Sequence, residues 1–297
     1  MPEVAVRPHR GFARRLLLAS RPVSWINTAF PFAAAMLLTT GAIDARLLIG
    51  TLFFLVPYNL AMYGINDVFD YASDARNPRK GGVEGALLPP EAHAATLWCS
   101  ALLALPFVVA LVLLGGPASW AVLAVSLFAV VAYSAPRLRW KEVPVLDSIT
   151  SSIHFVSPAV YGLVLAGAEW TPALVALLVA FGCWGMASHA FGAVQDVVPD
   201  REGGIASIAT ALGARATVRL AIALWVAAGL LMLLTPWPAA LAGLVAVPYV
   251  LLAAPFWNVT DAGSAAANRG WRRFLWVNYA SGFVVTMLCI AWAMGVR

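Results

Sequence analysis

Charged residues are scarce in this sequence, and their scarcity limits the class of protein that it encodes. Of the 297 residues, 11% are Asp, Glu, Lys or Arg, whereas 62% are hydrophobic. Soluble domains carry about 25% charged residues, so this composition excludes an ordinary soluble protein. A chain whose main solvent is lipid fits instead. We therefore expect an integral protein of a cell membrane.

Cysteine is also rare. Cys99, Cys183 and Cys289 stand alone in different apolar segments, which excludes a disulfide framework and a zinc site built on paired cysteines. A glycine-rich phosphate loop of the nucleotide-binding type is missing as well. The net charge of +5 does not indicate nucleic acid as a partner, because the arginines lie between apolar runs and form no basic face.

Long apolar runs make up most of the chain. A transmembrane helix needs about 20 apolar residues, and nine runs are long enough to cross a bilayer. No stretch remains for a soluble domain, so residues 1–297 are predicted to form one all-α membrane domain. The run 16–20 before Arg21 is too short for a signal peptide, so we expect no cleavage. The nine runs are residues 22–40, 46–66, 92–114, 118–136, 145–167, 171–195, 215–234, 237–257 and 272–295.

Basic residues gather in alternate loops and predict the orientation of the chain. All of the 19 Lys and Arg residues except Arg46 and Arg297 lie before the first run or in the connections that follow the even-numbered runs. These connections are counted as residues 67–91, 137–144, 197–219 and 258–273. The positive-inside rule then places the N-terminus in the cytoplasm and the C-terminus outside. An odd number of spans agrees with this orientation.

The rare acidic residues form a cluster at the end of the second run. The stretch 66–74 holds three of the 14 Asp and Glu residues, namely Asp67, Asp70 and Asp74. If the helix continues through this stretch, the three carboxylates point from one face. Like charges on one face require a cation, and carboxylate oxygens suit a hard divalent ion such as Mg²⁺, which commonly bridges to phosphate.

A second acidic cluster ends the sixth run. Asp196 and Asp200 lie one helical turn apart, and Pro199 is expected to bend that turn. Both clusters follow an Asn or Gln and precede a Gly-Gly pair, which indicates an internal duplication of two four-helix repeats followed by a ninth helix. A less specific interpretation is that both clusters are solvated helix ends. On the predicted orientation, both open to the cytoplasm.

Acidic and basic residues at the same cytoplasmic face of the membrane predict a diphosphate site. The acids would bind Mg²⁺, and the metal would bind phosphate oxygens. The remaining charge would be taken by Arg21, Arg137, Arg139 and Lys141. Asn66 would bind a phosphate or orient Asp70. If the phosphate belongs to an allylic isoprenoid, loss of diphosphate leaves a carbocation that an apolar pocket shields from water. These features favour a membrane-embedded prenyl transferase over a transporter, whose acidic site usually lies near the bilayer midplane.

Two histidines and several amides lie within or beside the apolar runs. His154 and His189 fit either a buried histidine bonded to a backbone carbonyl or a proton acceptor, and the sequence leaves both open. Amides such as Asn27 bridge helices in membranes, and we include Asn27 with Arg21 among the candidate substrate-binding residues. Gly162, Gly167, Gly182 and Gly185 fit close helix packing or space for a rigid polyene.

The paired acidic motifs resemble those of a known family. Asn66-Asp67-x-x-Asp70-x-x-x-Asp74 with Asp196-x-x-x-Asp200 is similar to the UbiA superfamily of intramembrane prenyltransferases, and the resemblance covers the whole chain. It implies nine helices around a central cavity and both motifs bound to Mg²⁺ and diphosphate during catalysis. It also implies that the loop after the fourth helix supplies a Tyr and basic residues that resemble Tyr133, Arg137 and Lys141.

Three further stretches resemble the lycopene elongases of C50 carotenoid synthesis. These are residues 21–29, 57–65 and 76–85. The resemblance implies dimethylallyl diphosphate as the donor and lycopene, or another apolar polyene, as the acceptor at each of its two ends. The acceptor cation would then lose a proton or take up water. An aromatic quinone precursor is the alternative acceptor, and it would need a more polar pocket wall.

Overall fold

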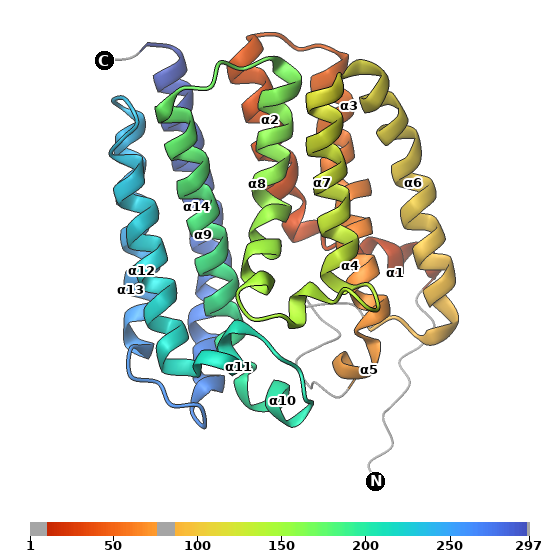
Figure 1. Cartoon of the computed structure of the whole chain (residues 1–297), viewed down its shortest axis with the longest axis vertical. Helices are drawn as coiled ribbons and strands as arrows, with labels where there is room; N and C mark the ends of the chain where they lie inside the picture. The colour runs from red at the N-terminus through yellow and green to blue at the C-terminus, as the bar shows by residue number, and fades with distance from the viewer. Residues whose placement is uncertain (1–10, 76–86, 296–297) are drawn as a thin grey trace.

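The fold is helical throughout the part of the chain that the structure describes. The computed structural model covers residues 11–75 and 87–295, and these ranges contain α and 3-10 helices but no strand. Within them, nine helical spans are long and apolar enough to cross a membrane. Figure 1 shows the spans side by side as one bundle. The predicted all-α, multi-pass membrane fold is therefore confirmed.

The helices follow the predicted apolar runs closely. Short helices at one end of the bundle join the long ones. In chain order the α-helices are α1 (Phe12–Ala19), α2 (Trp25–Thr40), α3 (Ala45–Leu55), α4 (Pro57–Phe69), α5 (Tyr71–Asp74), α6 (His93–Leu114), α7 (Pro117–Ser134), α8 (Leu146–Ala166), α9 (Pro172–Val194), α10 (Val197–Glu202), α11 (Ile208–Leu212), α12 (Ala214–Met232), α13 (Ala246–Ala253) and α14 (Asn268–Ala293).

Two spans differ from a single straight helix. The second span breaks between α3 and α4 at Val56, because Pro57 has no N–H to continue the hydrogen-bond ladder. The side chain of Asn59 donates to the carbonyls of Phe54 and Leu55 that the break exposes, at 2.8 and 3.1 Å. The eighth span begins with a 3-10 helix over Ala239–Val245 and continues as α13.

Two hydrophobic cores hold the bundle together. The first gathers residues of α2, α3, α4, α6, α7 and α8 around buried Phe32, Phe54 and Tyr161. The second gathers residues of α9 to α14 around buried Phe191 and Trp225. Helices α8 and α9 pack against each other and join the two halves. Figure 1 shows the first half on the right and the second half on the left.

Glycine allows the closest helix contacts. A Cβ atom on Gly162 would lie 2.8 Å from the carbonyl oxygen of Phe32, and one on Gly185 would lie 2.5 Å from Ser152 Oγ. These two glycines therefore serve close packing rather than space for a substrate. Gly167 has a φ of +73° and ends α8, whereas a Cβ on Gly182 would meet nothing within 4 Å. A Cβ on Gly167 would likewise meet nothing within 4 Å, so Gly167 and Gly182 are the two of these four glycines with open space beside them.

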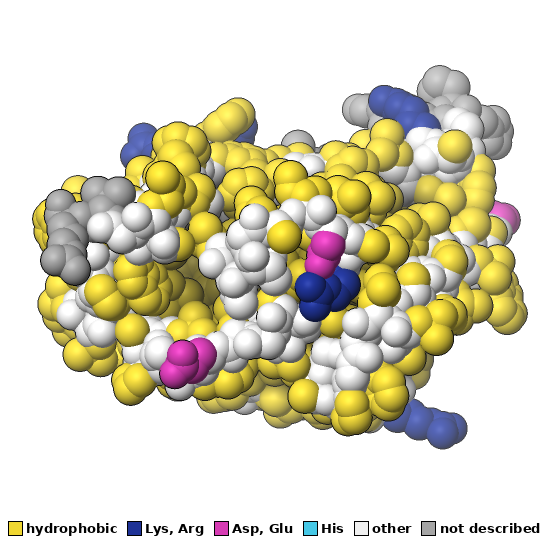
Figure 2. Space-filling model, turned by 90° about the horizontal axis from the view of Figure 1, so that it is seen from above, with side chains coloured by type: hydrophobic (Ala, Val, Ile, Leu, Met, Phe, Trp, Pro, Cys, Tyr) yellow, Lys and Arg dark blue, Asp and Glu magenta, His cyan; other side chains and the backbone are white. Residues whose placement is uncertain are grey.

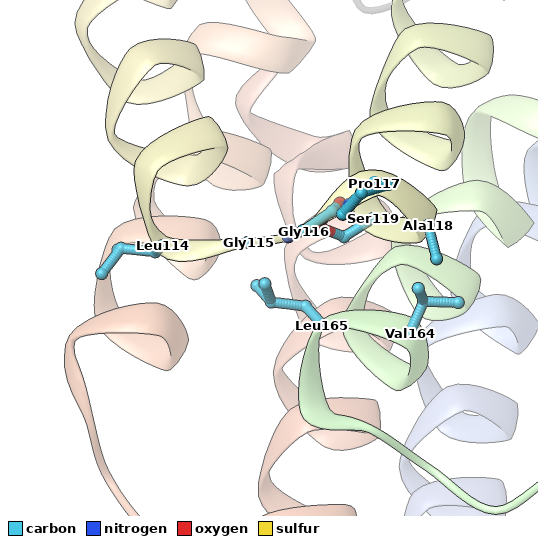
Figure 3. Close-up of a pocket in the computed structure, with 8 residues that line it drawn as sticks. All are labelled: Leu114, Gly115, Gly116, Pro117, Ala118, Ser119, Val164 and Leu165. Atoms are coloured by element: carbon cyan, nitrogen blue, oxygen red, sulfur yellow. Dashed lines mark hydrogen bonds between the residues drawn. The ribbon is translucent and has the colours of Figure 1, made fainter.

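The two ends of the bundle differ in chemistry. We call the lower end in Figure 1, where α5, α10 and α11 lie, the acidic end. Figure 2 looks onto the opposite end and shows mostly hydrophobic side chains with few charged ones. A shallow cavity of about 230 Å³ lies there, between the α6–α7 turn and the end of α8 (Figure 3). Because this cavity lies away from the acidic residues, it is not the predicted substrate site.

Candidate active site

The first acidic segment is almost completely buried. Asp67, Asp70 and Asp74 are 1%, 5% and 8% exposed. Helix α4 ends at Phe69 and α5 begins at Tyr71, so the predicted continuous helix is interrupted at Asp70. The i to i−4 bonding nevertheless continues, because the amide of Asp70 donates to the carbonyl of Asn66 and that of Asp74 donates to the carbonyl of Asp70, each at 2.9 Å. The helical spacing predicted for the three carboxylates is thus retained.

A buried arginine neutralises the first carboxylate. The Arg21 guanidinium donates to Asp67 Oδ1 at 3.0 Å and lies over the ring of Tyr63, 4.2 Å from its centre. Arg21 adopts a left-handed backbone conformation with φ 48°, at the turn between α1 and α2. The turn directs its side chain into the bundle. This contact joins the first described helices to α4 and places Arg21 beside the acidic segment. Its substrate-binding role stays a prediction.

Two cations from the loop after α7 approach the second carboxylate. Lys141 forms an ion pair with Asp70, and Arg139 lies 3.7 Å from the same Asp70 oxygen. Asn66 donates to the other oxygen of Asp70 at 2.7 Å. Burial raises the pKa of Asp70 above its ordinary value, and the charges of Lys141 and Arg139 oppose that rise. Asn66 therefore orients Asp70, as predicted.

Arg139 rather than Arg137 is the arginine beside the acids. Arg137 is exposed, whereas Arg139 is half-buried between Asp70 and Glu142. Both residues have a positive φ, so the loop turns sharply twice and presents alternate side chains in different directions. The charge pattern of the sequence indicated both arginines, and the resemblance alone favoured Arg137, because spacing does not report such turns.

Tyr133 joins the site to the two histidines. Its hydroxyl lies 3.2 Å from His189 Nε2, and its ring packs edge-on against the ring of His154 with centres 5.2 Å apart. His189 also lies 3.0 Å from Ser148 Oγ through its other nitrogen. The buried Asp147 is bonded instead to the backbone N–H of Ser148 and Ile208. Asp147 therefore has a structural role, in fixing the start of α11 to α8.

The second acidic segment is more open than the first. Asp196 and Asp200 are half-buried, and the Asp200 amide donates to the Asp196 carbonyl at 2.9 Å. The chain bends after α9, and Pro199 lies in the first turn of α10. The neighbouring Arg201 turns away and binds Asp261 at 2.5 Å. The two residues thus lie one turn apart, as predicted.

Amides tie this second segment to the last span. Asn268 donates to Gln195 at 2.5 Å. Asn278, about three turns further along α14, donates to Asn27 of α2 at 3.2 Å. Asn27 therefore bridges two helices, as amides do in membranes. Its substrate-binding role stays a prediction.

The donor set fits a hard divalent cation. Five carboxylates lie at the acidic end, three of them buried, and carboxylate oxygens are the ligands that Mg²⁺ prefers. Within residues 11–75 and 87–295, no three metal-binding side chains converge into a preformed group. Arg21 and Lys141 instead supply positive charge at Asp67 and Asp70. The metal-ligand roles of Asp67, Asp70, Asp74, Asp196 and Asp200 stay predictions. Residues 76–85, which carry part of the resemblance, lie outside the described ranges.

Fold and site together define a class of protein. The chain is a multi-pass helical membrane protein with a buried site of carboxylates, cations and amides at one end, and such a site suits an anionic group neutralised by a metal ion. The chain belongs to the UbiA prenyltransferase family, whose model matches residues 28–278. This membership makes it a prenyltransferase and rules against the transporter alternative.

Named relatives and solved structures agree with this family. A lycopene elongase/hydratase of Corynebacterium glutamicum is 53% identical over 94% of this chain and 97% of its own length. A C50 β-cyclic carotenoid biosynthesis protein of a Dietzia species is 55% identical over 96% of this chain and 66% of its own. A UbiA homologue from Archaeoglobus fulgidus, solved with DMAPP and Mg²⁺, shares the fold with a TM-score of 0.65 and 19% identity, over 92% of this chain and 99% of that one.

Proposed function

We propose that this prenyltransferase transfers dimethylallyl groups from dimethylallyl diphosphate to the two ends of lycopene and gives C45 and C50 carotenoids in a Mg²⁺-dependent reaction. One observation carries the proposal: a buried acidic segment whose charges meet Arg21, Arg139 and Lys141. The lycopene elongase/hydratase relative supports the choice of donor and acceptor, because more than half of its residues are identical over nearly the whole chain.

The acidic end would hold the diphosphate. Asp67, Asp70, Asp74, Asp196 and Asp200 are the residues that would hold Mg²⁺. When bound, Mg²⁺ would neutralise the diphosphate and stabilise the charge that develops on it as the C–O bond breaks. Lys141 and Arg139 would exchange part of their contact with Asp70 for phosphate oxygens, where charge-assisted bonds are strong. Asn66 would keep Asp70 in place during that exchange.

The apolar interior would then protect the carbocation. The C–O bond of the donor breaks, and its electron pair leaves with the diphosphate. The terminal double bond of the polyene attacks the dimethylallyl cation, so that one C–C bond forms and the positive charge moves to the acceptor. The surrounding helices exclude water from the first cation. A proton leaves in the last step, either from the acceptor cation itself or from a water molecule that adds to it.

The orientation of the chain belongs to the same proposal. The described basic residues Arg139, Lys141, Arg201 and Arg269 lie in segments that border the acidic end. The positive-inside rule favours a cytoplasmic location for this end, with the N-terminus inside and the C-terminus outside. A reporter fused after residue 297 should be active only outside the cytoplasm.

Reconstitution tests the function directly. Protein in liposomes would receive labelled dimethylallyl diphosphate, Mg²⁺ and either lycopene or an aromatic quinone precursor. We expect a C45 product first and a C50 product later, because one site acts on the two equivalent ends in turn, and we expect a chelator to stop both. Prenylation of the aromatic precursor while lycopene stays unchanged would replace the proposed acceptor.

A further inference from the structure

One buried histidine has an unsatisfied ring nitrogen. His154 lies in α8, is 3% exposed, and its Nε2 has no hydrogen-bond partner in the described part of the chain. A buried polar atom without a partner destabilises the folded state, so such an atom in a native protein calls for an explanation. The interpretation of His154 as a fully satisfied core histidine fails at this nitrogen.

The other side of the imidazole fixes which nitrogen carries the proton. The polar group of α7 that interacts with the imidazole of His154 is the backbone of Ala129. Helix α7 already uses the N–H of Ala129, so the partner is its carbonyl and the ring donates. A neutral imidazole has one donor nitrogen and one acceptor nitrogen. Nε2 is therefore the acceptor, a lone pair held in the interior of the bundle.

The position of His154 relative to Tyr133 places this lone pair next to the site. Tyr133 follows Ala129 by one turn of α7, towards the acidic end, and its ring packs edge-on against that of His154. His154 thus lies on the membrane-interior side of Tyr133. Along α8 it is about 10 Å deeper than Asp147, at 1.5 Å per residue. A prenyl chain whose diphosphate binds at Asp67 and Asp70 would extend towards this depth.

The second histidine of the site is not equivalent. Both nitrogens of His189 have partners, Tyr133 at 3.2 Å and Ser148 at 3.0 Å. It is held as a linker between α7, α8 and α9. His154 has the free acceptor that His189 lacks, although the two residues flank the same tyrosine.

We propose that His154 Nε2 accepts the proton that the prenyl transfer releases; this inference rests on the proposed function. Once the new C–C bond has formed, the acceptor carries a positive charge on carbon. Either a neighbouring C–H bond breaks, its electrons form a double bond and its proton goes to Nε2, or water adds to the cation and gives its extra proton to Nε2. In both cases diphosphate leaves with the electron pair of the C–O bond, and the imidazole becomes imidazolium. The proton then returns to solvent between turnovers.

The test measures the amount of prenylated carotenoid formed per diphosphate released, which we call the coupling, in addition to the activity. His154→Gln keeps a polar side chain of similar size but cannot take the proton. We expect diphosphate release to stay within about threefold of wild type, while prenylated carotenoid formed per diphosphate released falls about 100-fold, the usual contribution of a positioned base. Dimethylallyl alcohol should appear instead. Ser157→Ala is the matched control, because Ser157 is buried one turn further along α8 and bonded to Ser126 at 2.6 Å.

Chemical rescue separates a base from a packing role. His154→Gly would be assayed with added imidazole and with pyrazole, which has the same shape but is a much weaker base. Imidazole alone should restore coupling. Equal rescue by both compounds, full coupling in His154→Gln, or a loss of diphosphate release as large as the loss of product would each overturn the inference. Failure of the wild-type protein to release diphosphate would instead overturn the proposed function.

Discussion

The two acidic segments have similar sequences and different surroundings. In the first, Asp67 and Asp70 are buried and face Arg21 and Lys141. In the second, Asp196 and Asp200 are half-buried, and the adjacent Arg201 binds Asp261 rather than the motif. Repetition of a motif therefore does not repeat its burial, because the neighbouring loops differ.

This difference indicates a division of work between the segments. Buried charges that have partners are costly to change, since the loss of one leaves the other uncompensated. Half-buried carboxylates near solvent remain hydrated, and the removal of their water when a ligand binds costs less free energy than a change to a buried ion pair. The first segment is thus part of the folded framework as well as the site, whereas the second is more open to a ligand.

Substitution of one carboxylate in each segment should show this difference most strongly. Asp67→Asn and Asp196→Asn are each expected to lower turnover by ~100-fold or more, because each removes a proposed metal ligand. Asp67→Asn should also lose about 3 kcal/mol of stability, since Arg21 stays buried without its counter-charge. Thermal unfolding in detergent would measure the second effect. Equal stability of the two variants would refute the division of work.

Removal of the cations should sharpen the comparison. Arg139→Gln and Lys141→Gln are each expected to lower kcat/KM by about tenfold or more, because a charge-assisted contact with phosphate is lost. Arg201→Gln should change kcat/KM by less than about twofold, since a surface ion pair contributes little. Arg137→Gln serves as the control from the same loop as Arg139. A larger effect at Arg137 than at Arg139 would restore the order predicted by resemblance.

The amides at the start of the two segments should also behave differently. Asn66→Leu removes the donor to Asp70 and is expected to lower kcat about fivefold, the value of one hydrogen bond near 1 kcal/mol. Gln195→Leu removes the acceptor of Asn268 and should lower stability by about 1 kcal/mol with little change in kcat. Steady-state kinetics and thermal unfolding of both variants make the comparison. Identical profiles would contradict it.

The smallest effect is expected at Asp261, outside the spans. The N–H of Ala214 and the charge of Arg201 hold the pKa of Asp261 below its ordinary value of 3.8. A carboxyl whose folded pKa is lowered stabilises the protein above its unfolded pKa, and that contribution disappears as the pH falls through the folded value. Asp261→Asn should therefore cost about 0.5 kcal/mol at pH 7 and progressively less as the pH falls through the folded pKa. A cost that persists unchanged in acid would exclude this linkage.

The sequence predicted the spans and the acidic residues because both depend on local pattern. Apolar runs must form helices in lipid, where every backbone polar group needs an internal partner. Asp67, Asp70 and Asp74 were found by their helical spacing, which survives the interruption at Asp70. The spacing of Asp196 and Asp200 was equally informative, and it also required no knowledge of long-range contacts.

The features that the sequence missed depend on contacts between distant segments. The sequence placed Arg139 at the same membrane face as Arg137 but did not show that it, and not Arg137, reaches Asp70. That contact depends on the positive φ of both arginines, which no local preference of Arg predicts. The unsatisfied nitrogen of His154 appears only when α7 and α8 are packed together. Helix α1 was missed because its apolar stretch is too short to span a membrane, although it precedes the turn that directs Arg21 inward.

The second hydrophobic core has an optical consequence. Its largest buried side chain is Trp225, stacked on Tyr249 at 5.4 Å and on Phe274 at 6.4 Å, with Trp184 and Trp271 at its edge. The first core holds Phe and Tyr in the corresponding interior and no tryptophan. Because apolar surroundings shift tryptophan emission to shorter wavelength, Trp225 contributes to the blue part of the fluorescence of this protein. Trp225→Phe would remove that contribution and leave the emission of the first-half tryptophans unchanged. A red shift on unfolding that the wild type shows and Trp225→Phe lacks would therefore report the opening of the second core.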